Sequence, residues 1–385
     1  MKKNILTLFL TVLLSGLFFA DLSFADMPKV RVLVAENQKQ LLISVKGDYV
    51  IKALPSLQIL KKGRRLVNAP VTLSSSGIKF QDLNVPARGV RVEPLNDRDL
   101  FVGRSRFRGR IDILKNPSTG FYAINELPME SYLYGVLHHE VSSWWPMEAL
   151  KAQAIAARTY ALYEVQVSKS EEYDLKSNTS SQVYGGSTTE RYRTKRAVDM
   201  TAGKILTYEG KVFPAYFHAT CAGVTTGARE LWKIDLPPLA GGAKCSYCRI
   251  SPHYHWEARV SLSEIEDKMR KNNRAVGRIL EIRPVTQTPS HRVGSLKIAG
   301  TQSETVMAAK DLRIWIGGDK IRSTNFTVAL EDDAALFHGK GWGHGVGLCQ
   351  WGALGQSLLG KKYEEILGLY YPGAKISSDN GKAPQ

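Results

Sequence analysis

The chain has 385 residues, of which 43% are hydrophobic, and a formal net charge of +16 at pH 7. The hydrophobic fraction is ordinary for a globular protein, and the length is enough to bury a large core and suggests about two domains. The positive charge favours polyanionic partners, such as an anionic cell wall or membrane surface, although a basic solubilising surface would give the same composition.

Residues 1–25 have the pattern of a signal peptide. Lys2 and Lys3 give a basic start, residues 5–20 form an apolar core, and small residues stand at the cleavage positions. We expect an exported protein of the periplasm or cell wall that starts at Asp26 and carries a net charge of +15. A membrane anchor is the alternative, but the apolar run is short for a spanning helix. Nucleic acid is a poor candidate partner, because the chain contains no recognisable binding motif.

Short alternating segments follow in residues 26–114 and predict a β-rich N-terminal lobe. Gly, Pro, Asn and Asp separate them, as is typical of turns between strands. FYAIN, at residues 121–125, reads as one more strand that leads into a helical region. The predicted strands of the lobe are VRVLVA, QLLISVK, YVIKAL, LQILKK, GIKFQDL, GVRVEPL and GRIDIL.

Residues 125–162 predict two helices that meet at Glu140. Met129, Leu133, Val136 and Leu137 share one helix face with Glu140, so a carboxylate ends an apolar stripe. A charge in such a place costs free energy unless it is paired or protonated. A carboxyl group with a raised pKa is what a general acid needs near neutral pH. The alternative is that Glu140 simply points to solvent at the helix end.

The second helix of this region opens at Pro146, whose missing N–H costs little at that position. Arg158 and Tyr160 lie off its inward face and are expected at the surface, although they could also serve a site. The inward stripe consists of Leu150, Ala154, Ala157 and Ala161.

Helices and strands alternate irregularly in the rest of the chain. Helices are predicted over residues 190–202, 261–273, 308–316 and 363–370. A hairpin over residues 204–219 turns at Glu209-Gly210, and ILEIRPV, SLKIAG and FTVAL read as strands. The absence of regular βαβ alternation predicts an α+β fold. Residues 377–385 are polar and are expected to be a flexible tail.

Six motifs occur in an order that resembles the stage II sporulation protein D and amidase enhancer family (SpoIID/LytB). The resemblance runs from about residue 30 to residue 376 and implies a two-lobed protein in which residues 115–376 form a SpoIID/LytB-like core around a substrate cleft. The motifs are NELPMESYLYGVLHHEV, WPMEALKAQAIAARTYAL, QVYGGSTTE, FHATCAG, GKGWGHGVGLCQWGALG and KKYEEILGLYYPGAKI.

The resemblance implies a lytic transglycosylase that cleaves peptidoglycan glycan strands between N-acetylmuramic acid and N-acetylglucosamine and leaves a 1,6-anhydro ring. Glu140 stands at the family's catalytic position, whereas His138 and His139 depart from many relatives. Because the sugar's own 6-hydroxyl attacks, one carboxyl group can act as acid and then as base, whereas ordinary glycosidases use two. No cofactor is needed for this chemistry. The alternatives are a non-catalytic enhancer of a separate cell-wall amidase and a wall-binding module.

Six further residues are candidates for binding the glycan. In the glycine-rich motif, Trp342 and Trp351 can stack on sugar faces, and His344 can donate to a sugar or position Glu140. The alternative for this motif is a tight turn that feeds a helix near Ala353. The remaining candidates, which lie in other motifs of the family, are Gln182, Tyr184 and Tyr216.

The cysteines predict a structural zinc site. Three thiols and one imidazole, from His218, Cys221, Cys245 and Cys248, would complete a closed tetrahedral site. His253 or His255 can replace the imidazole, and a disulfide is the alternative in an oxidising compartment. The metal rests on spacing alone, since zinc ligands of the family lie in a region where this chain has none. Cys349 is expected to be a packed small residue.

Overall fold

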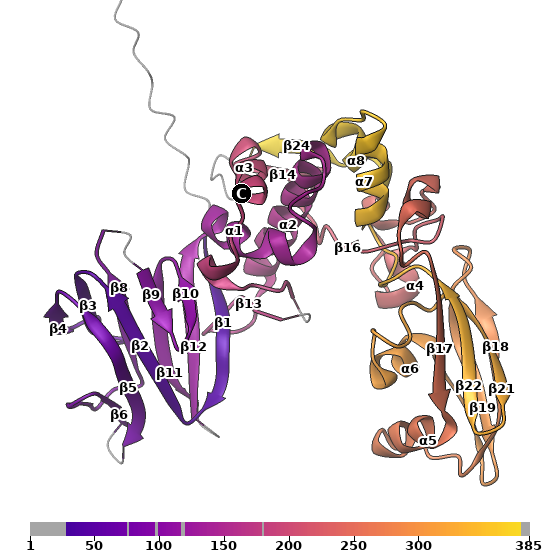
Figure 1. The fold of residues 1–385 in the computed structure, drawn as a ribbon, viewed down its shortest axis with the longest axis horizontal. Coiled ribbons are helices and arrows are strands. Elements are labelled where there is room, and N and C mark those ends of the chain that lie inside the picture. Colours follow the sequence, from indigo (N-terminus) through magenta and orange to yellow (C-terminus); the bar gives the residue numbers. More distant parts are fainter. Residues whose placement is uncertain (1–27, 75–76, 97–98, 117–119, 179–180, 379–385) are drawn as a thin grey trace, which may run out of the picture.

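The computed structural model describes residues 28–74, 77–96, 99–116, 120–178 and 181–378. The predicted signal peptide lies outside these residues. The α+β prediction is confirmed, since helices and several separate sheets both occur (Figure 1). Within the described ranges, no helix is long and apolar enough to cross a membrane.

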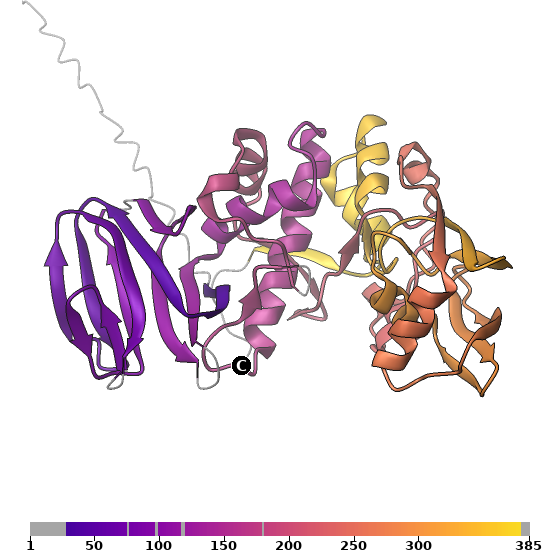
Figure 2. The same ribbon diagram turned by 60° about the horizontal axis from the view of Figure 1, so that its bottom comes forward.

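The N-terminal lobe consists of two sheets that face each other, and nearly all of their strand pairs are antiparallel (Figure 2). Alternation explains the packing, because in β2 the residues Leu41, Ile43 and Val45 are buried while their neighbours are not. One sheet contains, in spatial order, β13 (Leu175–Lys176), β1 (Lys29–Gln38), β12 (Gly120–Pro128), β11 (Arg110–Asn116), β8 (Gly89–Pro94), β3 (Tyr49–Leu54) and β4 (Ile59–Gly63). The other contains β10 (Ser105–Phe107), β9 (Asp99–Val102), β2 (Gln40–Lys46), β5 (Leu66–Ser74), β6 (Gly77–Phe80) and β7 (Leu83–Val85).

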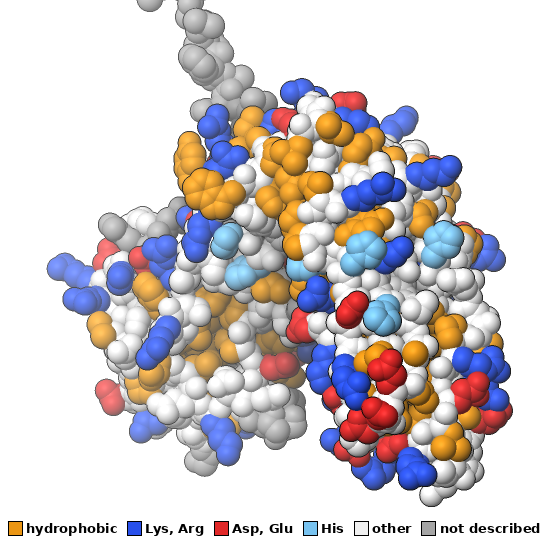
Figure 3. Space-filling view, turned by 45° about the vertical axis from the view of Figure 1, so that its right-hand side comes forward, with side chains coloured by type: hydrophobic (Ala, Val, Ile, Leu, Met, Phe, Trp, Pro, Cys, Tyr) orange, Lys and Arg blue, Asp and Glu red, His pale blue; other side chains and the backbone are white. Residues whose placement is uncertain are grey.

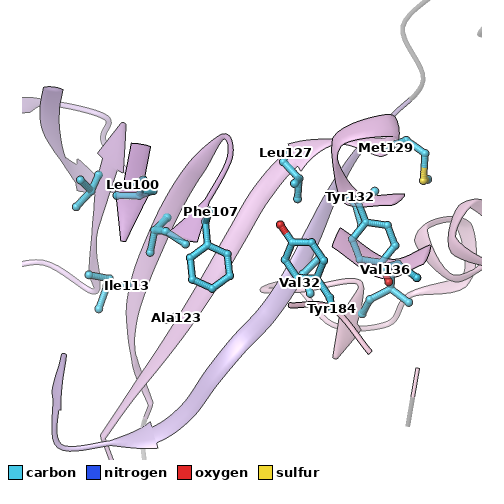
Figure 4. Packing of buried hydrophobic residues seen from close by; sticks show 14 of the residues in the cluster. Val32, Leu100, Phe107, Ile113, Ala123, Leu127, Met129, Tyr132, Val136 and Tyr184 are labelled. Atoms are coloured by element: carbon cyan, nitrogen blue, oxygen red, sulfur yellow. The ribbon is translucent and has the colours of Figure 1, made fainter. Parts of the chain in front are cut away.

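The first sheet continues through the boundary predicted near residue 114. β12 pairs with β1 on one side and with β11 on the other. The chain then enters α1 (Met129–Glu140), whose apolar stripe joins the core of the lobe. Figure 4 shows Tyr132 and Val136 of α1 beside Tyr184 and the sheet residue Val32. The strands and the helix therefore form one packed unit.

The long helix α2 (Met147–Val167) is shared by two hydrophobic cores. Its predicted stripe is buried in the first core, while Ala149, Ala152 and Ile155 belong to the second. Arg158 is fully buried, against expectation, because its guanidinium group pairs with Glu130 at 2.7 Å and donates to backbone carbonyls. Because α2 has alanines on several of its sides, both cores can pack closely against it.

The second core is built from segments that are distant in sequence (Figure 1). The predicted hairpin forms, with its turn at Glu209-Gly210, and its first strand also pairs with the final strand. That final strand includes Ser377 and Ser378, which were expected in the flexible tail; residues 379–385 lie outside the described part. Two elements after α2 pack on the first core instead: α3 (Tyr192–Met200), which contributes Ala197 and Val198, and the 3-10 turn at Gly186–Thr189. The remaining elements are β14 (Lys204–Tyr208), β15 (Lys211–Val212), β16 (Phe217–His218), α4 (Ala228–Trp232), β23 (Leu348–Cys349), α7 (Gln350–Leu358), α8 (Tyr363–Tyr370) and β24 (Lys375–Ser378), with short 3-10 turns at Pro237–Leu239 and Ser246–Ile250.

A third unit has a hydrophobic core of its own. The described residues thus form three hydrophobic cores. In Figure 2 this unit lies at the opposite end of the molecule from the N-terminal lobe. Its elements are β17 (His255–Ser261), α5 (Leu262–Lys271), β18 (Ile279–Gln287), β19 (Val293–Gly300), β20 (Glu304–Ala308), α6 (Ala309–Ile316), β21 (Phe326–Glu331) and β22 (Ala334–Lys340).

Candidate active site

A pocket of about 610 Å³ lies at the point where α1 ends and α7 begins. It collects side chains from the α1–α2 connection, from the loop after β16, and from the segments on either side of the third unit. In the space-filling view, histidine side chains lie next to apolar side chains across the middle of this face, while Lys and Arg are spread widely (Figure 3). The lining residues are His138, His139, Glu140, Val141, Ser142, Trp145, Ala219, His253, Trp342, Gln350 and Trp351.

Glu140 is the last residue of α1 and lines this pocket. The chain leaves the helix at Val141, which is extended (φ −142°), so the carboxyl group stands at the edge of the apolar stripe. Burial raises the pKa of Glu140 to about 7, although hydrogen bonds from the Val183 backbone N–H and the Gln350 side chain favour the ionised form. A carboxyl group in this state is protonated about half of the time near neutral pH and can both donate and accept a proton.

Aromatic rings form the walls of the pocket. The indole of Trp351 packs edge-on against Trp145, with 5.4 Å between ring centroids. The His253 ring lies 6.3 Å from the Trp351 ring and 4.5 Å from the Trp342 ring, so it stands next to both indoles. The Arg322 guanidinium lies 5.2 Å from the Trp342 ring. Flat, amphipathic surfaces of this kind suit the apolar faces of sugar rings.

The two histidines that precede Glu140 also line the pocket. Burial lowers the pKa of His138 and of His139, and the positive charge of Arg191 lowers both further. Both rings are therefore neutral near pH 7, and each offers one donor and one acceptor nitrogen. The Nδ1 atom of His138 is buried, and no group in the described part of the chain forms a hydrogen bond with it.

Three of the predicted glycan-binding residues lie outside the pocket and have structural partners. Gln182 is buried and accepts a hydrogen bond from the Tyr132 hydroxyl at 3.0 Å. Tyr184 is buried and donates to Asn125 at 2.8 Å. Tyr216 packs on Trp232, with 4.5 Å between ring centroids.

His344 also does not line the pocket. Its Nδ1 accepts a hydrogen bond from the Val346 N–H at 3.1 Å, so its Nε2–H donates to the Phe217 carbonyl at 3.0 Å. Burial lowers the pKa of this imidazole to about 3, and the nearby Arg292 charge lowers it further. With both nitrogens bonded to backbone groups, His344 joins the glycine-rich segment to β16.

The glycine-rich segment is irregular because its backbone is left-handed at alternate residues. Gly343 has φ 99° and Gly347 has φ 68°, which side chains other than glycine rarely adopt. A Cβ atom at Gly347 would stand 2.0 Å from the Tyr216 carbonyl oxygen. The segment therefore passes close to β16, and it presents Trp342 at one end and Gln350 at the other to the pocket.

The four cysteines lie together behind this pocket. The sulfur atoms of Cys221, Cys245, Cys248 and Cys349 are all within 4.8 Å of one another, and all four residues are buried. The structure thus places Cys349 where the sequence placed His218, whose Nδ1 pairs with the Val346 carbonyl at 3.1 Å. The sequence could not bring Cys349 to this group, because it follows Cys248 only after the whole third unit.

Two further alternatives from the sequence also lie outside the group of sulfur atoms. His253 lines the pocket, and His255 is an exposed residue at the start of β17. Sequence analysis missed Trp145, Gln350 and His253 as pocket residues. The sequence signals for Trp145 and Gln350 were their positions beside Pro146 and Trp351, within motifs of the family.

Comparisons with known proteins identify the family of the chain. A family model described as Stage II sporulation protein matches residues 118–208, which contain Glu140. Stage II sporulation protein D of Bacillus subtilis (strain 168) is 30% identical over 278 residues, covering 67% of this chain and 77% of that protein. The chain belongs to the stage II sporulation protein D family. A second family model, described as a domain of unknown function (DUF8618), matches residues 247–347 of the chain, a range that includes the third unit.

Two other relatives show how the similarity is distributed. An uncharacterized protein of Brachyspira hyodysenteriae is 32% identical over 371 residues, covering 93% of this chain and 95% of that protein. The amidase enhancer of Bacillus subtilis (strain 168) is 27% identical over 290 residues, which is 64% of this chain and 40% of the enhancer. The chain therefore spans less than half of the length of the amidase enhancer.

Proposed function

We propose that this chain is an exported peptidoglycan lytic transglycosylase in which Glu140 acts first as general acid and then as general base. The observation that carries the proposal is the chemistry of the pocket. Among the described residues that line it, Glu140 is the single acidic side chain. Hydrolysing glycosidases place two carboxyl groups around the bond, so a one-carboxylate pocket favours a reaction in which the substrate supplies its own nucleophile.

The reaction needs no water and no cofactor. Protonated Glu140 donates its proton to the glycosidic oxygen as the bond to the anomeric carbon of N-acetylmuramic acid breaks. The 6-hydroxyl oxygen of the same sugar then bonds to that carbon, and the Glu140 carboxylate accepts the hydroxyl proton. The products are a 1,6-anhydro end and a free N-acetylglucosamine hydroxyl, and the carboxyl group returns to its starting state.

The local environment of Glu140 supports both halves of this cycle. Burial raises the pKa of Glu140 to about 7, which keeps a large protonated fraction near neutral pH. The hydrogen bonds from Val183 and Gln350 stabilise the carboxylate that forms after the first proton transfer. Trp342 and Trp351 offer ring faces on which neighbouring sugars can stack.

The test is the release of anhydro-muramyl products from purified glycan strands, measured by mass spectrometry with and without stem peptides. Glu140→Gln keeps the shape but cannot donate an acidic proton, so turnover should fall on the order of 10²–10⁴-fold while binding to insoluble peptidoglycan remains. Glu364→Gln, at an exposed position on α8, is the matched control and should keep full activity. Undiminished release by Glu140→Gln would refute the assignment.

The second candidate is a non-catalytic enhancer of a cell-wall amidase, which is favoured by the name of the Bacillus subtilis relative. An enhancer releases no anhydro ends by itself. If neither the parent nor Glu140→Gln releases product, and both stimulate an added amidase equally, this second candidate replaces the first.

A further inference from the structure

The side chains of four cysteines lie together in the interior, next to the pocket, and their sulfur atoms form one cluster. Cys221 follows β16, Cys245 precedes the 3-10 turn Ser246–Ile250 that contains Cys248, and Cys349 ends β23. Three separate segments thus converge, and none of the four side chains is more than 1% exposed. An ordinary core rarely concentrates so many polarizable and reactive groups in one place.

The sulfur geometry fits a tetrahedral metal site. Zinc bound to thiolates has Zn–S distances of about 2.3 Å, which sets the sulfur atoms about 3.8 Å apart. The Cys221 and Cys248 sulfur atoms are 3.6 Å apart, and all four lie within 4.8 Å of one another. A disulfide instead needs about 2.0 Å between two sulfur atoms and would leave the other two thiols unexplained.

Hydrogen-bond donors point at the sulfur atoms, as they do around metal-bound thiolates. The backbone N–H groups of Cys221 and Gly352 both donate to the Cys349 sulfur, each at 3.3 Å. The Tyr370 hydroxyl lies 3.1 Å from the Cys245 sulfur. A Cβ atom at Gly352 would stand 2.6 Å from the Cys245 sulfur, so glycine lets α7 begin against the cluster.

A buried cation balances the charge that such a site would carry. Four thiolates and one zinc ion have two net negative charges, which an apolar interior does not tolerate alone. Arg292 is only 1% exposed, and its Nε and Nη2 groups have no hydrogen-bond partner among the residues that the structure describes. Burial lowers the pKa of this guanidinium to about 10, whereas the charges of Cys221 and Cys349 act in the opposite direction and favour its charged form. Its Nη1 group donates to the Gly343 carbonyl at 3.0 Å.

We propose that Cys221, Cys245, Cys248 and Cys349 hold one zinc ion in a closed four-thiolate site, and that this site fixes the start of α7. Gln350, the next residue, donates to Glu140 and is therefore a positioning residue. The zinc assignment stands without the proposed function, whereas the positioning role rests on it.

The first experiment counts metal and thiols in the full exported chain after dialysis in metal-free buffer. Elemental analysis should find about one zinc per chain. Titration of thiols in denaturant with a strong chelator and no reductant should find all four cysteines reactive. Absence of zinc, iron in its place, or loss of two thiols to a disulfide would each overturn the assignment.

The second experiment identifies the fourth ligand. Cys349→Ser should release zinc to a chelator at least ten times faster than the parent, whereas His218→Asn, its buried neighbour, should retain zinc. If Cys349→Ser does not fold, cobalt can replace zinc in the parent chain. The charge-transfer absorption should then correspond to four thiolates, and a spectrum of three thiolates and one imidazole would restore His218 and reject Cys349.

The third experiment tests the positioning role through a pH profile. Gln350→Leu removes a donor to ionised Glu140, so the basic limb of the rate profile should move to higher pH while zinc stays at one per chain. Stripping zinc from the parent, at a temperature where it stays folded, should move the limb in the same direction. A change in thermal stability without any movement of the limb would reject positioning. If the chain shows no turnover at all, the zinc and thiol counts still decide the metal site.

Discussion

Replacing Glu140 should stabilise the protein at high pH while it removes activity. Burial raises the pKa of Glu140 to about 7 from the ordinary carboxyl value of 4.5, so the unfolded chain ionises this group more readily than the folded protein does. Each pKa unit corresponds to about 1.4 kcal/mol. The ionised carboxylate therefore costs the folded protein up to about 3 kcal/mol, a cost that is absent below pH 4.5 and complete above pH 7.

The assay is thermal unfolding of the parent and of Glu140→Gln at pH 4.5 and at pH 8. The variant should gain stability only at the higher pH, by about 6 °C in Tm, because about 1 kcal/mol shifts Tm by at least about 2 °C in domains of this size. Glu364→Gln should show the same difference from the parent at both pH values. Equal shifts in Tm for Glu140→Gln at the two pH values would refute the reasoning that burial of the ionised Glu140 carboxylate destabilises the folded protein.

Three other outcomes follow from the structure. Gln350→Leu should raise the pKa of Glu140 further, seen as a basic limb at higher pH in the rate profile, whereas an unchanged limb would exclude the hydrogen bond. Glu130→Gln should lower the free energy of unfolding by about 3 kcal/mol, because the fully buried Arg158 would lose its charged partner; urea denaturation checks this, and a neutral effect would contradict it. The exported chain should begin at Asp26, which intact-mass spectrometry checks, and a retained leader would instead support a membrane anchor.

Local periodicity was sufficient to predict α1 and its end at Glu140. The stripe of Met129, Leu133, Val136 and Leu137 is buried as expected, because a helix face is determined by spacing alone. Arg158 was wrongly expected at the surface, since the partner that buries it, Glu130, lies on another helix. The strand β5 was missed because Pro70 interrupts its alternation, and β9 and β10 are too short to show a pattern.

The pocket itself was only partly predictable, because its walls come from four distant segments. Trp342 and Trp351 were found through the glycine-rich motif, and Glu140 through its stripe. His344 was a reasonable candidate by residue type, but its two nitrogens are engaged by backbone groups that only the fold brings near. Contacts of this kind depend on tertiary packing, and no spacing along the chain encodes them.

The third unit is joined to the rest of the chain in a simple way, but one of its charged residues, Arg292, reaches the glycine-rich segment. The unit is entered and left on paired strands, with His255 opposite Lys340, and just outside this pair the Gly341 N–H donates to the Tyr254 carbonyl at 2.9 Å. We call residues 255–340 the cassette. Because Tyr254 and Gly341 are hydrogen-bonded neighbours, a chain without the cassette needs only a tight turn to connect them. The unit cannot be removed without an electrostatic change, because Arg292 lies within residues 255–340 and would be lost with them. A lineage that lost the cassette would therefore also lose the buried cation that the proposed four-thiolate site uses to balance its charge, together with the hydrogen bond from Arg292 to the Gly343 carbonyl.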